Sequence, residues 1–352
     1  MSAVSHHRPT ATHRHGLWLA AGLALVSCAL MLLGVAVGST GFDSVLQMQN
    51  DPQALQIITE IRLPRTAGAW LAGALLGLAG AVAQGLFRNP LADPGLIGVS
   101  AGASLAAVAT IVLEAWVLAA VPALAPVRAA LGFYLLPLAA FAGACATTLL
   151  VYQLAQEGGR AVVATMLLAG IAINALAGAL TGLLTYAATD EQLRSVTFWG
   201  LGSLGGASWP VVGGLLPFLA GPLLWLPRLG KPLNLLSLGE EQATHLGLPV
   251  TRLKRQLIGL STLAVGASVA VAGSIGFLGL VVPHLVRLVA GPDHRRVLAG
   301  SALGGAALMV LADTLARTLV APAELPIGIL TALLGTPAFL WILLREKRLR
   351  QL

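Results

Sequence analysis

Long apolar stretches, interrupted by short polar ones, follow one another along almost the whole chain of 352 residues. An α-helix needs about 20 mainly apolar residues to cross the hydrocarbon core of a bilayer. The pattern predicts ten membrane-spanning helices, of which the eighth is short and the break before it, at Gly273–Gly276, is the least sharply marked. The predicted spans are residues 17–38, 66–87, 94–113, 131–154, 161–186, 209–227, 256–275, 277–290, 299–319 and 326–344.

The first apolar stretch has the position of a signal peptide. It is longer than the apolar region of such a peptide, and the other predicted spans follow it. We therefore interpret it as an uncleaved first helix. The predicted organisation is a cytoplasmic N-terminal tail, residues 1–16, and a single transmembrane domain, residues 17–352.

Composition supports an all-α integral membrane protein. Hydrophobic residues make up 57% of the chain and charged residues only 10%, and the mean hydropathy is +0.85. Soluble domains carry about 25% charged residues. The 41 glycines favour a tightly packed bundle, because small residues let membrane helices approach closely.

Basic residues are distributed unevenly between the two sides of the predicted bundle. An even number of spans places both termini on one side, and cytoplasmic loops are enriched in Lys and Arg. With cytoplasmic termini, 16 of the 21 basic residues fall inside: Arg8, Arg14, Arg88, Arg160, Arg228, Lys231, Arg252, Lys254, Arg255, Arg287, Arg295, Arg296, Arg345, Lys347, Arg348 and Arg350. Five fall outside: Arg62, Arg65, Arg128, Arg194 and Arg317. The net charge of +7 thus reflects membrane topology and not nucleic-acid binding.

A short polar segment, Leu238–Gly247, lies between two apolar stretches. It must lie outside the bilayer, and its basic flanks place it on the cytoplasmic side. We predict a helix that begins at Ser237 or one residue later. Glu240 and Glu241 suit its positive N-terminal end, and the last glycine of the segment, followed by Pro249, ends it.

An internal repeat is faintly visible. Gly73–Pro90 aligns with Gly266–Pro283 at an offset of 193, with five identical positions. In the predicted topology the two copies run in opposite directions, as inverted repeats of transporters do. Chance identity between two segments rich in small residues is the alternative.

Two further features have plain interpretations. Cys28 and Cys145 lie in apolar stretches and are interpreted as buried small hydrophobic residues, so no disulfide framework is predicted. The tail segment Ser5–His15 holds four of the seven histidines. We interpret it as a disordered cytosolic tail rather than a metal site.

The sequence lacks the groups that would power transport. It contains no phosphate-binding loop of the form G-x-x-x-x-G-K-[ST]. Ion-coupled transporters keep carboxylates inside the membrane, but Asp313 is the only acid clearly within a predicted span, and Arg317 one turn later can pair with it. An ion-coupled secondary transporter is therefore a disfavoured alternative, and a membrane enzyme has no catalytic cluster to support it. The free energy for transport has to come from a partner.

Several segments resemble the permease family of bacterial ABC importers for haem, iron-siderophores and cobalamin. They are Arg62–Arg65, Gln84–Gly102, Gly276–Arg287 with Asp293–Arg295, and Ala323–Gly328. The resemblance covers nearly the whole chain. It implies a ten-helix subunit of the cobalamin-importer (type II) fold that works as a homodimer in the bacterial inner membrane. Two partner ATPase subunits bind ATP and Mg²⁺, a periplasmic binding protein delivers the ligand, and this chain itself holds no cofactor or metal.

The resemblance assigns a docking role to three outward arginines. Arg62, Arg65 and Arg317 match arginines that receive acidic residues of the binding protein. Guanidinium groups suit bidentate contacts with carboxylates. Anchoring at the membrane interface is their alternative role.

Two cytoplasmic segments also match the family. The polar segment matches the helix that couples the permease to its ATPase, through Gly239, Glu240, Glu241, Ala243, Leu246 and Gly247. An ordinary solvated helix is the alternative. Asn89 and Leu91 match a cytoplasmic gate. Prolines fix the backbone around them, so a plain rigid turn is the alternative.

The predicted cargo is haem, with a ferric siderophore or cobalamin as alternatives. The end of the fifth span and a predicted short half-helix, Ser195–Ser203, resemble the haem-importing branch more than the cobalamin branch. Arg194 would attract haem propionates, and Phe198 and Trp199 would face the flat ring. Aromatic residues at membrane interfaces are more often anchors. His284 resembles a Pro-His pair found across the family and is interpreted as structural.

Overall fold

The structure is a computed structural model and describes residues 10–38 and 51–350. Apart from an antiparallel pair of short strands, β1 (Gln156–Glu157) and β2 (Arg160–Ala161), the regular elements in these residues are helical. The α-helices are α1 (Thr10–Ala36), α3 (Pro52–Gln56), α4 (Leu63–Leu86), α5 (Val99–Ala120), α6 (Ala125–Leu131), α7 (Leu135–Leu154), α8 (Val163–Tyr186), α9 (Asp190–Leu201), α10 (Trp209–Leu236), α11 (Glu240–His245), α12 (Val250–Ala272), α13 (Leu278–Ala290), α14 (His294–Thr318) and α15 (Ile327–Arg350). The short π- and 3-10 segments are η1 (Ile57–Arg62), η2 (Pro94–Ile97), η3 (Pro122–Leu124) and η4 (Gly132–Tyr134).

The predicted spans have counterparts in the fold. In the described part of the chain, eight helices are long and apolar enough to cross a membrane, and two shorter apolar helices, Trp209–Pro222 and Leu278–Ala290, accompany them. Each predicted span overlaps one of these helices, so the all-helical membrane class is confirmed. That all ten cross the bilayer stays a prediction, because α13 has only 13 residues, or about 20 Å at 1.5 Å per residue.

Several helices extend beyond the apolar stretches that predicted them. Helix α1 begins at Thr10 and not at residue 17, and α10 continues to Leu236. Helix α4 continues a helical run that starts at Pro52. Hydropathy detects only the apolar part of a helix, whereas backbone hydrogen bonding continues into polar turns. The His-rich tail is therefore helical from Thr10 onward, and its residues 5–9 lie outside the described residues.

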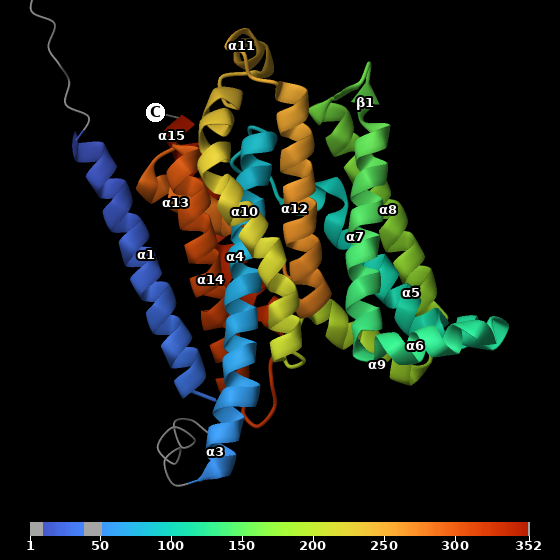
Figure 1. Cartoon of the computed structure of the whole chain (residues 1–352). Coiled ribbons are helices and arrows are strands. Elements are labelled where there is room, and N and C mark those ends of the chain that lie inside the picture. The colour runs from blue at the N-terminus through green and yellow to red at the C-terminus, as the bar shows by residue number, and fades with distance from the viewer. Residues whose placement is uncertain (1–9, 39–50, 351–352) are drawn as a thin grey trace, which may run out of the picture.

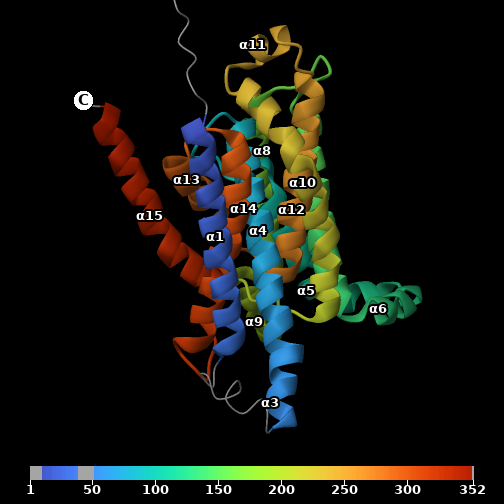
Figure 2. The same ribbon diagram turned by 60° about the vertical axis from the view of Figure 1, so that its left-hand side comes forward.

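The elements outside the bundle gather at two opposite ends (Figure 1). The start of α1, helix α11, the β1–β2 pair and the C-terminal end of α15 lie at one end, here called the α11 end. Helices α3, α6 and α9 lie at the other, the α3 end, and α6 projects sideways from it (Figure 2). The described ends of the chain thus lie on one side, as an even number of spans predicts.

Helix α4 runs through the centre of the bundle, surrounded by α10, α12, α13 and α14. Nearly all of its 24 residues are buried, as expected of a helix that is apolar on every side. A Cβ atom at Gly77 would lie 2.1 Å from the carbonyl oxygen of Ser301 in α14, and one at Gly73 would lie 2.4 Å from that of Gly305. The backbones of α4 and α14 therefore touch, as in membrane helix pairs with glycines four residues apart.

The outer helices are open on their apolar sides. In the most apolar window of α4, 89% of residues are buried, against 17% in α8 and 28% in α15. Helix α15 diverges from the bundle toward the α11 end (Figure 2). The exposed face of such a helix meets lipid or another protein. Cys28, predicted to be buried, is exposed on α1 for the same reason, and Cys145 is half-buried on α7.

The two segments aligned as a repeat differ in secondary structure. The first consists of the end of α4 and the turn after it, whereas the second contains the break between α12 and α13. This break, at residues 273–277, lies where the glycines predicted it. The repeat itself stays a prediction.

Candidate functional site

Helix α11 protrudes from the α11 end between α10 and α12 (Figure 1). It begins at Glu240, later than predicted, because Gly239 adopts φ 119° and ψ 151°, a conformation that glycine tolerates. At its other end Gly247 has φ 81°, and its amide donates to the carbonyl oxygen of Thr244 at 2.9 Å. This is a left-handed C-terminal cap, so glycines bound the helix on both sides.

Most of α11 faces solvent. Ala243 is fully buried, whereas Leu246 is 60% exposed. Glu241 is also exposed, and Glu240 is half-buried. Ala243 is thus the buried residue of α11, and the helix presents most of its remaining surface to a partner or to water.

Lys254 connects α11 to two other elements. Its Nζ donates to Oε2 of Glu240 at 2.6 Å and to the carbonyl oxygen of Ala161 at 2.8 Å. The residue is only 4% exposed, and a buried ammonium is tolerated when it is paired. Sequence reasoning counted Lys254 only among the basic flanks. Its place on the buried face of α12, one turn before Leu257 and Ile258, is the signal that would have singled it out.

A cleft of about 730 Å³ opens beside α11. Helix α11, strand β2 and the first turns of α12 form its walls. Charged residues of both signs line it: Arg160, Glu240, Glu241, Arg252, Lys254 and Arg255. Such a surface suits a polar protein partner, because complementary charges steer association and fix its register.

Asn89 and Leu91 lie in the turn after α4. Oδ1 of Asn89 accepts a hydrogen bond from the amide of Leu91 at 3.0 Å, which is how asparagine stabilises a turn locally. The Asn89 amide donates to the carbonyl oxygen of Gln84 at 3.1 Å. In the single chain these contacts form a rigid turn, and a gate would require further elements to face it.

The last turn of α4, just before Asn89, is bound to α13. Nε2 of Gln84 donates to the carbonyl oxygen of Leu280 at 3.0 Å, and its Oε1 accepts from Nη1 of Arg287 at 3.0 Å. Oδ1 of Asp93 accepts from the amide of Gly95 at 2.7 Å and caps η2. Burial raises the pKa of Asp93, although this hydrogen bond acts in the opposite direction.

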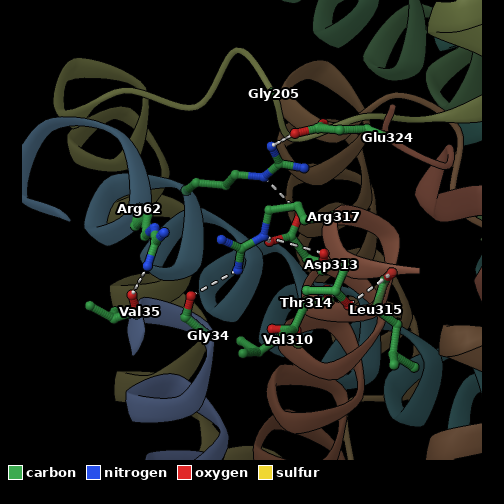
Figure 3. A network of polar contacts seen from close by, with 12 residues as sticks. Gly34, Val35, Arg62, Gly205, Val310, Asp313, Thr314, Leu315, Arg317 and Glu324 are labelled. Carbon is green, nitrogen blue, oxygen red and sulfur yellow. Dashed lines mark hydrogen bonds and ion pairs between the residues drawn. The ribbon is translucent and has the colours of Figure 1, made fainter. Parts of the chain in front are cut away.

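The three arginines predicted to dock a partner are buried at the α3 end. Figure 3 shows Arg62 and Arg317 there, with Asp313 beside Arg317. Nε of Arg65 lies 2.9 Å from Oδ1 of Asp313, and its Nη1 lies 2.7 Å from Oε1 of Glu324. Nε of Arg317 lies 3.1 Å from Oδ2 of Asp313, which confirms the pairing predicted from their spacing. Asp313 is 1% exposed, whereas the Glu324 side chain is 42% exposed.

Backbone carbonyls complete this arginine network. Nη1 of Arg62 donates to the carbonyl oxygen of Ala36 at 2.9 Å, and Nη2 of Arg317 donates to that of Gly34 at 2.9 Å. The arginines thus hold the end of α1 against α4 and α14. All three side chains are buried in the structure, and of their acceptors only Asp313 for Arg317 was recognisable in the sequence.

The residues predicted to line the outer pathway lie on α9 at the α3 end (Figure 1). This helix begins at Asp190 rather than at residue 195, because Thr189 forms a capping box with Gln192. Arg194 is exposed and Phe198 is 60% exposed, whereas Trp199 packs against the core. Successive helical residues point in different directions, so the two aromatic rings do not form one wall.

Comparison with known proteins identifies the family. A model of the FecCD transport family matches residues 22–345. The chain belongs to the FecCD transport family. It is 45% identical to the hemin transport system permease protein of Yersinia pestis, over 94% of this chain and 96% of that protein. It is 41% identical to the vitamin B12 import system permease protein of Shigella boydii, over 91% and 94%.

One solved structure agrees with this FecCD assignment, and a second supports the fold. An ABC transporter of metal-chelate type, in an inward-facing conformation, matches with a TM-score of 0.81 and 34% identity, over 93% of this chain and 98% of that one. PsaBC from Streptococcus pneumoniae, solved with a Fab, matches with a TM-score of 0.53 and 17% identity, which supports the fold alone. The chain is a permease of an ABC importer, as its sequence motifs predicted.

Proposed function

We propose that this chain forms the path by which haem enters the cell, as the membrane subunit of an ATP-driven importer. The observation that carries the proposal is the 45% identity to the hemin permease of Yersinia pestis over nearly the full length of both proteins. Vitamin B12 is the second candidate cargo, because the permease of Shigella boydii is 41% identical. A ferric siderophore is the third.

A separate ATPase supplies the energy in this proposal. The sequence holds no phosphate-binding loop of its own. The protruding α11 and the charged cleft beside it offer a polar surface for that partner. The coupling residues are Gly239, Glu240, Glu241, Ala243, Leu246 and Gly247. The α11 end is then cytoplasmic, and the membrane is the bacterial inner membrane.

A periplasmic binding protein docks at the α3 end. The network there holds three guanidinium groups, those of Arg62, Arg65 and Arg317, and two carboxylates, Asp313 and Glu324. Its excess positive charge favours an acidic partner. The Glu324 carboxylate is the exposed acid of the network, so a carboxylate of the binding protein would compete with it for Arg65.

Two copies of the chain enclose the path. The open apolar faces of α8 and α15 are available for such pairing. In the dimer, Asn89 and Leu91 form the cytoplasmic gate. Arg194 and Phe198 on α9 contribute to the outer entrance, with Trp199 supporting them from the core side. The chain contributes different stabilities of its inward- and outward-open states rather than chemistry.

Uptake into proteoliposomes tests the proposal. The vesicles would contain this chain, its ATPase and its binding protein, and haem and vitamin B12 would be offered separately, with and without ATP. ATP-dependent accumulation of haem alone is the expected result. Accumulation of vitamin B12 alone would replace the cargo, and uptake that proceeds without any ATPase would overturn the importer assignment.

A further inference from the structure

A groove of about 340 Å³ runs along the bundle between α7 and α12. The two helices pack side by side (Figure 1). Residues three or four positions apart, which share one face of a helix, line it on each side. They include Cys145, Thr148 and Tyr152 on α7, and Arg255, Gly259 and Leu263 on α12.

The middle of the groove is apolar and open. Gly259 is exposed, and a Cβ atom there would meet nothing within 4 Å. Leu149 and Leu263 flank it and are 56% and 41% exposed. From Arg255 to Leu263 the groove extends about 12 Å along α12. The apolar part, from Gly259 to Leu263, extends about 6 Å, and such a slot on a membrane protein fits part of a hydrocarbon chain.

The mouth of the groove lies toward the α11 end and is basic. Arg255 is exposed in the second turn of α12 and also lines the charged cleft beside α11. Tyr152, near the end of α7, lines the same groove. Four basic and two acidic residues line that cleft. Basic pockets between membrane helices are typical sites for anionic lipid headgroups.

We propose that the groove between α7 and α12 binds one anionic glycerophospholipid. Arg255 holds the phosphate, and an acyl chain follows the slot from Gly259 to Leu263. The lipid then lies at the edge of the cleft beside α11. This binding does not depend on the identity of the cargo.

Native mass spectrometry of the purified chain tests this site, with phosphatidylglycerol or phosphatidylcholine added to the detergent micelles. The chain is expected to prefer phosphatidylglycerol. In Gly259→Leu the new side chain fills the slot, and binding of both lipids should fall to the background level. In Arg255→Gln the preference for the anionic lipid should fall about fivefold, as expected for one basic residue near a charged membrane surface.

Arg252→Gln is the matched control, because Arg252 lines the cleft but does not belong to the groove. It should keep the full preference, and the unfolding midpoint without lipid shows that each variant is folded. The proposal is overturned if Gly259→Leu still binds lipid. It is also overturned if Arg252→Gln loses the preference for phosphatidylglycerol while Arg255→Gln keeps it. A change in oligomer mass instead of bound lipid in Gly259→Leu would also overturn it, since a second copy would then cover the groove.

Discussion

Asp313 shows how much one buried side chain decides at the α3 end. It lies between Arg65 and Arg317, and all three are nearly inaccessible to solvent. The spacing of Asp313 and Arg317, one turn apart on α14, was visible in the sequence. The contact with Arg65 was not, because 248 positions separate the two residues.

The substitution Asp313→Asn should destabilise the protein strongly. It leaves two buried guanidinium groups without the carboxylate between them, and breaking a buried ion pair in this way costs about 3–5 kcal/mol. Thermal unfolding in detergent measures the effect. Glu324→Gln is the matched control, because that side chain is 42% exposed and an exposed pair contributes about 0–1 kcal/mol. Equal midpoints for the two variants would contradict the role of Asp313.

Asp93 gives a prediction with a defined pH dependence. Burial raises its pKa in the folded chain, so the folded state holds the proton more tightly than the unfolded state. Stability is therefore highest below the ordinary pKa of aspartate and falls as the pH rises from that value to the raised folded value. Asp93→Asn keeps an oxygen that can accept from Gly95 and removes the charge.

The Asp93→Asn variant should unfold at a higher temperature than the parent at neutral pH. The advantage should shrink as the pH falls through the raised pKa, because the parent carboxyl is then protonated as well. Unfolding midpoints of both proteins across the acidic and neutral range give the comparison. If the parent has the higher unfolding midpoint at neutral pH, other groups stabilise the charged carboxylate of Asp93.

At the level of elements, contact between helix backbones limits which residues fit. A Cβ atom at Gly80 in α4 would lie 1.8 Å from the carbonyl oxygen of Gly279 in α13. The atoms in the way belong to the backbone of Gly279. They cannot move aside unless α13 itself shifts. The hydropathy pattern predicted both helices, but it contains no information about which of their faces touch.

The substitution Gly80→Ala should therefore destabilise the bundle, by about 1–3 kcal/mol or more for an overpacked site. Gly22→Ala in α1 is the control, because Gly22 is exposed and its new Cβ would meet nothing within 4 Å. Alanine is the better helix former by about 1 kcal/mol, so that variant should be unchanged or slightly more stable. Thermal unfolding of the two variants separates steric conflict from helix propensity.

At the level of the whole molecule, Lys254 joins α11 to the part of the bundle that begins with β2 and α8. The link rests on its contacts with Glu240 and with the Ala161 carbonyl. Helix α8 packs on α5, α7 and η2, so this contact offers a direct route from α11 to that group. If α11 receives the motion of an ATPase, Lys254 positions the helix to pass it on.

The substitution Lys254→Met should lower cargo uptake per ATP hydrolysed by about fivefold or more, the usual lower range of coupling between sites, while ATP hydrolysis continues. Methionine keeps the apolar stem and removes the ammonium, and the half-exposed Glu240 stays solvated. Lys231→Met, at an exposed position of α10, serves as control. Unchanged uptake per ATP in Lys254→Met would mean that α11 needs no such tether, and loss of hydrolysis in both variants would point to the proposed ATPase surface instead.

The sequence by itself determined the membrane class, the approximate positions of the spans, the common side of the described ends and the family. These properties follow from hydropathy, charge and motifs. Each of the three is carried by residues that are close together in the sequence, so it can be recognised without the fold. The tertiary structure alone decided that the α3-end arginines are buried, that Lys254 reaches Ala161 and that a groove lies between α7 and α12. These features depend on which helix faces meet, and many different pairings of apolar helices satisfy the same hydropathy pattern.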